Sequence, residues 1–146
     1  MFRLFFLTLL CVGSLHSQEE PQHQFIGKHF LASYLDCDPE AIRNVDQLID
    51  SMDAAVRASN ATILEKTSHI FSPNGLTIVY LLSESHASLH TYPEYNACFV
   101  DIFTCGDHCS SAEFDQKLRA YLKPQTVSAR FLLRNETIQE GKYVEE

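Results

Sequence analysis

The stretch "GLTIVYLLSESHASLHTYPE" runs from Gly75 to Glu94 and places an apolar run directly before a segment rich in titratable side chains. The first part, Gly75–Leu82, is apolar in the manner of a buried strand. Side chains of a strand alternate between the two faces of a sheet, so His86, Ser88 and His90 are expected to share one face. The stretch therefore predicts one or two strands with a polar, histidine-bearing face.

On both sides of this stretch, the sequence shows further strand and helix signals. A capping box begins each of two predicted helices, Asn44 with Gln47 in the first and Ser110 with Glu113 in the second. The predicted helices cover residues 44–60 and 110–123, and the remaining predicted strands cover residues 27–35, 61–71, 97–103 and 126–133. This order, with its short links, predicts an α+β fold in which an antiparallel sheet carries its helices on one face.

The first residues differ in character from the rest of the chain. Residues 1–17 hold one arginine, then an apolar run, then small and polar residues, which is the layout of a secretory signal peptide. The run is too short to span a bilayer, so no membrane integration is expected. A start codon assigned too far upstream is the alternative, and the location stays open between export and the cytoplasm. The sequence then predicts a linker over residues 18–26, the folded domain over residues 27–134 and a polar tail over residues 135–146.

Composition and spacing limit the classes of function. The chain has 146 residues, the length of one domain, and a formal charge of −8. An acidic chain does not provide the basic surface that nucleic acids require, but it attracts small cationic substrates. No Gly-Ser-Gly nucleophile elbow and no glycine-rich phosphate loop occurs in the sequence.

Two groups of possible metal ligands occur close together in the sequence. His86 and His90 are followed by Cys105, His108 and Cys109, but their intervals do not match the paired short spacings of zinc sites, so no metal is expected. The alternative interpretation involves neither catalysis nor metal binding: the segment is a half-buried edge strand that carries histidines on its polar side.

Four segments carry a resemblance to a known family. The sequences "GKHFLASYLDCD", "HIFSPNG", "SESHASLHTYPE" and "VDIFTCG" begin at residues 27, 69, 83 and 100. Together they closely resemble the prokaryotic S-adenosylmethionine decarboxylases, over about Gly27 to Arg134. The resemblance implies the two-layer α+β sandwich of that family. It also implies decarboxylation of S-adenosylmethionine for spermidine, and hence polyamine, biosynthesis.

Members of this family are made as proenzymes, and the resemblance places the cleavage between Glu84 and Ser85. The Ser85 hydroxyl would attack the Glu84 carbonyl to give an ester. β-Elimination would then leave dehydroalanine, which hydrolyses to a pyruvoyl group and ammonia. The pyruvoyl group at position 85 is the implied cofactor, which forms a Schiff base with the substrate amine and withdraws electrons during decarboxylation.

The resemblance assigns further site residues one by one. His90 matches a histidine that assists processing, and Thr77 matches a hydroxyl residue that helps self-cleavage. Cys105 matches the residue that returns a proton to the substrate carbon, a task that suits a thiol near neutral pH. Glu94 matches a carboxylate that binds the ribose hydroxyls of the substrate. Phe71 matches an aromatic residue that stacks on adenine.

The chain also departs from the family pattern near the site. Tyr92 stands where the family usually has Trp, and "YNACFVD" (Tyr95–Asp101) replaces a run rich in Gly and Ala, so Tyr92 and Asn96 are expected at the rim of the substrate pocket. The superfamily includes arginine and ornithine decarboxylases, which gives one alternative. A non-catalytic exported binding domain on the same fold is another. The open face of the sheet, with the resemblance, predicts a homodimer of processed two-chain protomers with active sites near the interface.

Overall fold

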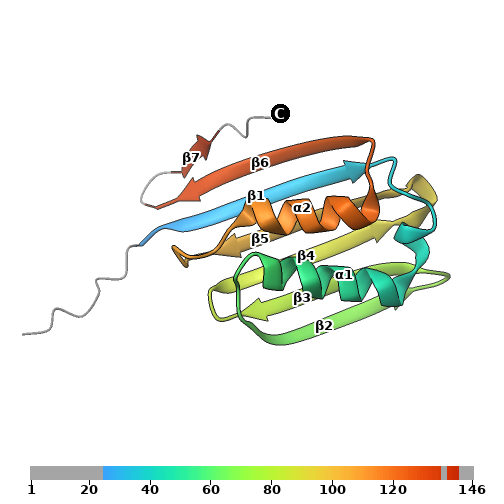
Figure 1. Cartoon of the computed structure of the whole chain (residues 1–146), viewed down its shortest axis with the longest axis horizontal. Coiled ribbons are helices and arrows are strands. Elements are labelled where there is room, and N and C mark those ends of the chain that lie inside the picture. The colour runs from blue at the N-terminus through green and yellow to red at the C-terminus, as the bar shows by residue number, and fades with distance from the viewer. Residues whose placement is uncertain (1–24, 136–137, 142–146) are drawn as a thin grey trace, which may run out of the picture.

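In the computed structural model, which describes residues 25–135 and 138–141, seven strands form one antiparallel sheet and two helices cover one of its faces (Figure 1). The strand order is β2-β3-β4-β5-β1-β6-β7, and the predicted α+β fold is confirmed. The elements are β1 (Gly27–Leu35), η1 (Ala41–Arg43), α1 (Val45–Ala58), β2 (Ile63–Phe71), β3 (Gly75–Leu82), β4 (Ser85–Tyr92), η2 (Pro93–Tyr95), β5 (Ala97–Thr104), α2 (Ser111–Leu122), β6 (Thr126–Arg134) and β7 (Ile138–Gly141).

Strands β3 and β4 form a tight hairpin near the centre of the sheet. Leu82 pairs with Ser85, so Ser83 and Glu84 make the turn between them. The sequence left open whether residues 75–90 form one strand or two, and the structure shows two. The turn therefore lies between Leu82 and Ser85, directly before the histidine-bearing part of the stretch.

Alternation along the strands divides the sheet into a helix-covered face and an open face. Large side chains buried under the helices include Phe30, Tyr34, Ile78, Tyr80, Leu89 and Ile102. The alternate positions form the open face, which carries His29, Leu31, Thr77, Val79, Leu81, His86, Ser88, His90, Phe99, Asp101 and Phe103. The prediction that His86, Ser88 and His90 share one face is confirmed.

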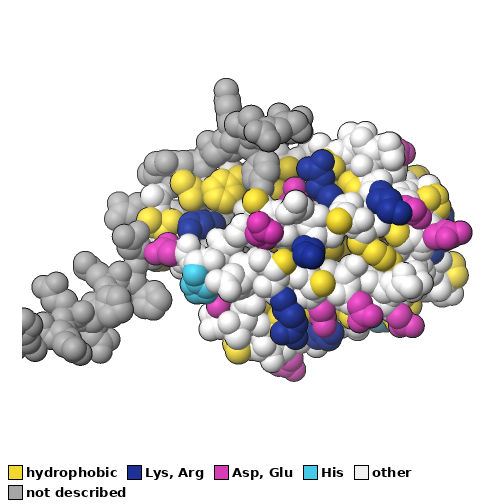
Figure 2. Space-filling model, viewed as in Figure 1, with side chains coloured by type: hydrophobic (Ala, Val, Ile, Leu, Met, Phe, Trp, Pro, Cys, Tyr) yellow, Lys and Arg dark blue, Asp and Glu magenta, His cyan; other side chains and the backbone are white. Residues whose placement is uncertain are grey.

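The helices begin with the predicted caps. The Asn44 side chain accepts a hydrogen bond from the Gln47 amide at 3.2 Å, and the Ser110 hydroxyl accepts one from the Glu113 amide at 3.3 Å. Asn60, with a φ of 65°, takes the left-handed conformation just beyond the end of α1. Basic and acidic side chains are interspersed on the outer surface of the helix-covered face (Figure 2).

The sheet extends beyond the predicted C-terminal limit of the domain. Short strand β7 lies in the segment predicted as a polar tail, and it pairs Ile138 with Arg134 of β6. Strand β7 thus adds an edge to the sheet that the sequence analysis did not foresee.

The predicted signal peptide and most of the predicted linker fall in residues 1–24, outside the described residues. Within the described parts of the chain, no helix is both long and apolar enough to cross a membrane.

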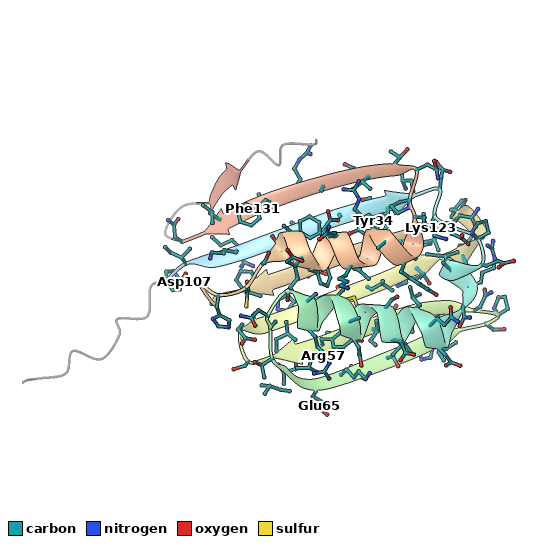
Figure 3. The ribbon with its side chains drawn as sticks, viewed as in Figure 1. Tyr34, Arg57, Glu65, Asp107, Lys123 and Phe131 are labelled. Atoms are coloured by element: carbon teal, nitrogen blue, oxygen red, sulfur yellow. The ribbon has the colours of Figure 1, made fainter. Side chains whose placement is uncertain are left out.

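A buried hydrogen bond joins β1 to α2. The Tyr34 hydroxyl donates to Asp115 Oδ1 at 2.5 Å, and both side chains are buried between α2 and the sheet. Figure 3 labels Tyr34 on β1. Burial, and then the charge of Asp115, raises the pKa of Tyr34 well above its ordinary value. The phenol therefore stays protonated and able to donate. Arg119 lies 3.5 Å from Asp115 Oδ2 and is a second partner of the carboxylate.

Substitution of Tyr34 by Phe should lower the free energy of unfolding by about 1–3 kcal/mol, because a buried Asp115 oxygen would lose its donor. Urea unfolding measures the loss, in a Ser85→Ala background that blocks the predicted cleavage. Tyr121→Phe is the matched control, since its hydroxyl donates to the Ala41 carbonyl at 3.0 Å from a half-buried position. A smaller loss is expected there, and equal losses would contradict the role of the buried pair.

Candidate active site

The β3–β4 turn holds Glu84 by both its backbone and its side chain. The Cys105 amide donates to the Glu84 carbonyl oxygen at 2.9 Å, and the Thr62 amide donates to Glu84 Oε2 at 2.9 Å. His108 Nε2 lies 3.4 Å from Glu84 Oε1. Burial raises the pKa of Glu84, but hydrogen bonds from Thr62, from its own amide and from His108 outweigh burial, so the pKa lies below its ordinary value. The Glu84 side chain is therefore a carboxylate held in place by hydrogen bonds, and its backbone carbonyl is polarised by the Cys105 amide.

Gly106 makes room for this arrangement. A Cβ atom at Gly106 would lie 3.1 Å from Glu84 Cγ and 3.0 Å from His108 Cε1. Both distances are shorter than ordinary van der Waals contact, so a larger residue would push against the Glu84 side chain. The glycine thus allows the loop after β5 to approach the β3–β4 turn closely.

Ser85, the residue directly after this carbonyl, has a strained backbone. Its φ of 148° lies in a region that residues other than glycine rarely adopt, at a typical cost of about 1–3 kcal/mol. Pairing of Ser85 with Leu82 on one side and Thr104 on the other holds it in this conformation. Its hydroxyl Oγ lies 3.1 Å from His86 Nδ1. The bond between residues 84 and 85 is therefore held by neighbours on both sides.

Cys105 follows directly after β5, beside the ladder partner of Ser85. Its backbone amide contacts the Glu84 carbonyl, as described above, and the residue is exposed. The structure therefore brings three predicted site residues, Glu84, Ser85 and Cys105, together at one end of the sheet. We call this group the turn site.

The other predicted residues gather at the opposite end of β4. Thr77 and His90 are ladder partners, and Thr77 Oγ1 lies 2.5 Å from His90 Nδ1. The His90 ring packs against Tyr92 at 4.7 Å and Phe71 at 6.0 Å between ring centroids. We call this group, with Glu94, the pocket site.

A cavity of about 460 Å³ lies at the pocket site and is lined in part by Phe71, His90, Tyr92 and Glu94. All three residues predicted to bind substrate, Phe71, Tyr92 and Glu94, thus line one cavity. Its volume is in the range of small-molecule sites.

Arg43 also lines this cavity, and the sequence analysis missed it. The guanidinium Nη1 donates to Asn96 Oδ1 at 2.9 Å, and Nη2 donates to the Pro93 carbonyl at 2.6 Å. These bonds hold the segment after β4 against η1. Nothing in the sequence marks Arg43 as part of this cavity, because its cavity-side partners Pro93 and Asn96 lie 50 and 53 residues further along the chain.

The turn site and the pocket site are far apart within one protomer. Ser85 and His90 are five residues apart on one strand, which at about 3.3 Å per residue separates them by roughly 16 Å. The β3–β4 turn and the β2–β3 turn accordingly lie at opposite ends of the sheet (Figure 1). Within one protomer, His90 and Thr77 therefore lie too far from Ser85 to contact it, so their predicted action on Ser85 is not direct there.

Three residues of the open face form a cluster that the sequence analysis did not identify. Ligand atoms of His29, His86 and Asp101 lie within 4.8 Å of one another, a grouping that could hold a metal ion. The earlier metal candidates paired His86 with His90, whereas the structure places His29 of β1 beside His86. Burial raises the pKa of Asp101, but His29 and a hydrogen bond from Ser88 outweigh burial and lower it. Asp101 is therefore a carboxylate.

Comparison with known proteins identifies the family of this chain. The family model described as "S-adenosylmethionine decarboxylase" matches residues 28–135. The S-adenosylmethionine decarboxylase proenzyme of Pyrobaculum islandicum is 42% identical over 108 residues, which are 73% of this chain and 86% of that protein. The proenzyme of Thermosipho africanus is 38% identical over 120 residues, which are 82% of this chain and 88% of that protein.

A solved structure shares the fold. The crystal structure of the adenosylmethionine decarboxylase from Aquifex aeolicus superposes with a TM-score of 0.67 at 30% identity, covering 84% of this chain and 96% of that one. The two-layer fold and these relatives define the chain as a decarboxylase, an enzyme of the carboxy-lyase class. It belongs to the S-adenosylmethionine decarboxylase family.

Proposed function

We propose that this protein is a self-processing, pyruvoyl-dependent decarboxylase of S-adenosylmethionine that serves spermidine biosynthesis. The observation that carries the proposal is the turn site, where the strained Ser85 follows a carbonyl held by the Cys105 amide. Strain at Ser85 favours any reaction that releases its backbone, and the Cys105 amide would stabilise negative charge on the Glu84 oxygen during attack. Both features favour cleavage of a peptide bond by the serine that follows it.

The residues of the turn site fit a cofactor derived from Ser85. Cleavage before Ser85 would leave the group at the first position of β4, where the ladder to Thr104 holds it beside Cys105. A pyruvoyl group supplies an electrophilic carbonyl that binds the substrate amine and withdraws electrons from the bond to carbon dioxide. Cys105 is exposed beside this position and would hold the proton that the substrate carbon receives.

The pocket site would bind the nucleoside part of the substrate. Phe71 and Tyr92 offer aromatic faces for adenine, and the Glu94 carboxylate can accept hydrogen bonds from ribose hydroxyls. The formal charge of −8 favours a substrate that carries a sulfonium cation. Arg43 would keep the rim of the cavity in shape through its bonds to Pro93 and Asn96.

A second copy of the chain would complete the site. The open face exposes four large apolar side chains, Leu31, Val79, Leu81 and Phe99, and a sheet needs a second layer on such a face. In a two-fold dimer with the open faces together, the pocket site of one protomer can lie over the turn site of its partner, and the reverse holds by symmetry. The separation of roughly 16 Å within a protomer thereby favours a homodimer with composite sites.

The first prediction from this proposal concerns cleavage. The purified protein should consist of two chains, one ending at Glu84 and one of 62 residues (146 − 84) that begins at position 85 with a pyruvoyl group. Intact-mass spectrometry measures both. Ser85→Ala should remain whole, since the attacking hydroxyl is removed, while Ser83→Ala in the same turn should cleave normally. A wild-type protein that stays whole under native conditions would overturn the proposed function.

The second prediction concerns the composite site. Coexpression of a Ser85→Ala chain with a His90→Ala chain should yield mixed dimers in which the His90→Ala chain is cleaved, because its Ser85 meets the His90 of the partner. Tagged chains allow isolation of mixed dimers, and mass spectrometry scores cleavage. As a control, the His90→Ala chain paired with a Ser85→Ala/His90→Ala chain should stay uncleaved. A fully active monomer in light scattering would contradict the dimer.

The third prediction concerns Cys105. Cys105→Ala should still cleave itself, because the backbone amide at position 105 remains, but it should form decarboxylated product from S-adenosylmethionine at least about 100-fold more slowly in the steady state. The chain beginning at position 85 should then gain an N-terminal alanine through misdirected protonation, which mass spectrometry detects. Cys109→Ser is the matched thiol control. Assays with arginine and ornithine run in parallel, and turnover of either instead would replace the proposed substrate.

A further inference from the structure

One histidine contacts the attacking group directly, and it is not His90. His86 Nδ1 lies 3.1 Å from Ser85 Oγ, which is hydrogen-bond distance. His90 lies five residues along the same strand, with its own Nδ1 on Thr77. Within one protomer, His86 is therefore placed to exchange a proton with the Ser85 hydroxyl.

A carboxylate lies behind this imidazole. Asp101 Oδ2 is 3.8 Å from His86 Nε2 and 3.5 Å from His29 Nε2. The Ser88 hydroxyl donates to the other oxygen of Asp101. His29 Nε2 is buried without a hydrogen-bond partner. The carboxylate thus faces two imidazoles, and it favours a proton on the Nε2 atom of His86.

Neighbouring strands hold the imidazoles in place. His29 and His86 both pair with Phe103 of β5, one from each side. The Phe103 ring packs at 5.2 Å from the His29 ring and 5.6 Å from the His86 ring between centroids. The His86 side chain keeps 45% exposure, whereas that of Asp101 keeps 22%. The cluster is therefore an ordered part of the open face, built from three adjacent strands.

We propose that His86 is the general base of the first step of self-cleavage, and that Asp101 is the residue that positions it. The proposal rests on the proposed function, since it needs a chain that cleaves itself at residues 84 and 85. It assigns the first step to groups of one protomer, Ser85, His86 and the Cys105 amide. The later elimination step is left to His90 of the partner subunit.

The proton balance of the step needs no further reactant. Neutral His86 accepts the Ser85 Oγ proton on Nδ1 as Oγ bonds to the Glu84 carbonyl carbon. The resulting oxyanion accepts the hydrogen bond of the Cys105 amide, and the imidazolium faces Asp101 through its Nε2–H. His86 then gives the proton to the Ser85 nitrogen as the carbon–nitrogen bond breaks. The products are an ester between residues 84 and 85, a free amine and neutral His86.

A metal ion bound to His29, His86 and Asp101 would prevent His86 from acting as a base. A cation held by Nε2 of His29, Nε2 of His86 and Asp101 would leave the His86 proton on Nδ1, which could then only donate to Ser85 Oγ. Base and ligand are exclusive roles for His86 in this geometry. Zn²⁺ is therefore expected to slow self-cleavage, and a chelator is expected to leave it unchanged or faster.

The test separates the two steps with hydroxylamine, which cleaves an ester between residues 84 and 85 but not the amide. Freshly translated His86→Ala and His86→Gln should cleave about 100- to 10,000-fold more slowly than the wild type and should resist hydroxylamine, because they stall before the ester. His90→Ala should stall after it and be cut by hydroxylamine. Gln keeps an acceptor for the Ser85 hydroxyl but cannot take its proton. The Gln variant therefore distinguishes loss of the base from loss of packing at position 86.

Matched variants test specificity. His69→Gln, on edge strand β2, should cleave at the wild-type rate. Asp101→Asn should slow cleavage in the wild-type background but add nothing in the His86→Gln background, whereas a purely structural defect would slow both. Thermal unfolding against Ser85→Ala identifies any variant that has lost its fold.

Each outcome decides between the proposals. Normal cleavage of folded His86→Gln overturns the role of His86 and leaves the proposed function intact. A hydroxylamine-sensitive His86→Gln moves His86 to the second step and also overturns the assignment. Loss of cleavage with a chelator and its recovery with Zn²⁺ would replace the base with a metal site. A wild-type chain that never cleaves overturns the proposed function, and the inference with it.

Discussion

The hydrogen bond from the Cys105 amide to the Glu84 carbonyl oxygen, 2.9 Å long, ties the end of β5 to the β3–β4 turn, and the chemistry proposed for the turn depends on it. It exists only because β4 and β5 pair in the register that sets Ser85 opposite Thr104. That register also fixes which side chains face the helices, since a shift by one residue would exchange the two faces of the sheet. One register therefore serves both the core and the turn site.

The two faces of the sheet have separate tasks. The helix-covered face provides stability through its buried side chains and the Tyr34–Asp115 pair. The open face carries the histidines together with exposed apolar side chains such as Leu81 and Phe99. A partner on this face would bury the apolar surface and bring a pocket site to each turn site in the same event. In the proposed dimer, assembly and activity thus share one surface.

Sequence patterns predicted much of this protein correctly. Capping boxes at Asn44 and Ser110 marked both helices, because these signals act within one turn of chain. Alternation along residues 86–90 predicted the shared face of the histidines, since a strand has a period of two. Phe71, Tyr92 and Glu94, taken from the family resemblance, all line one cavity. The role of each of these residues stays a prediction for experiment.

The sequence by itself determined both helices, most of the strands, the α+β class and the identity of the residues at the turn, because helix caps, strand alternation and the family motifs are local. Strand β7 was not among the predicted elements. Only the tertiary structure decided the strand order, which sets His29 beside His86 and brings Arg43 to the cavity of the pocket site. It also decided that His90 lies roughly 16 Å from Ser85, although the family resemblance had implied that His90 assists processing at Ser85. The reason is physical: an extended strand separates residues that a helix would bring together, and contacts between strands depend on pairing that no local pattern encodes.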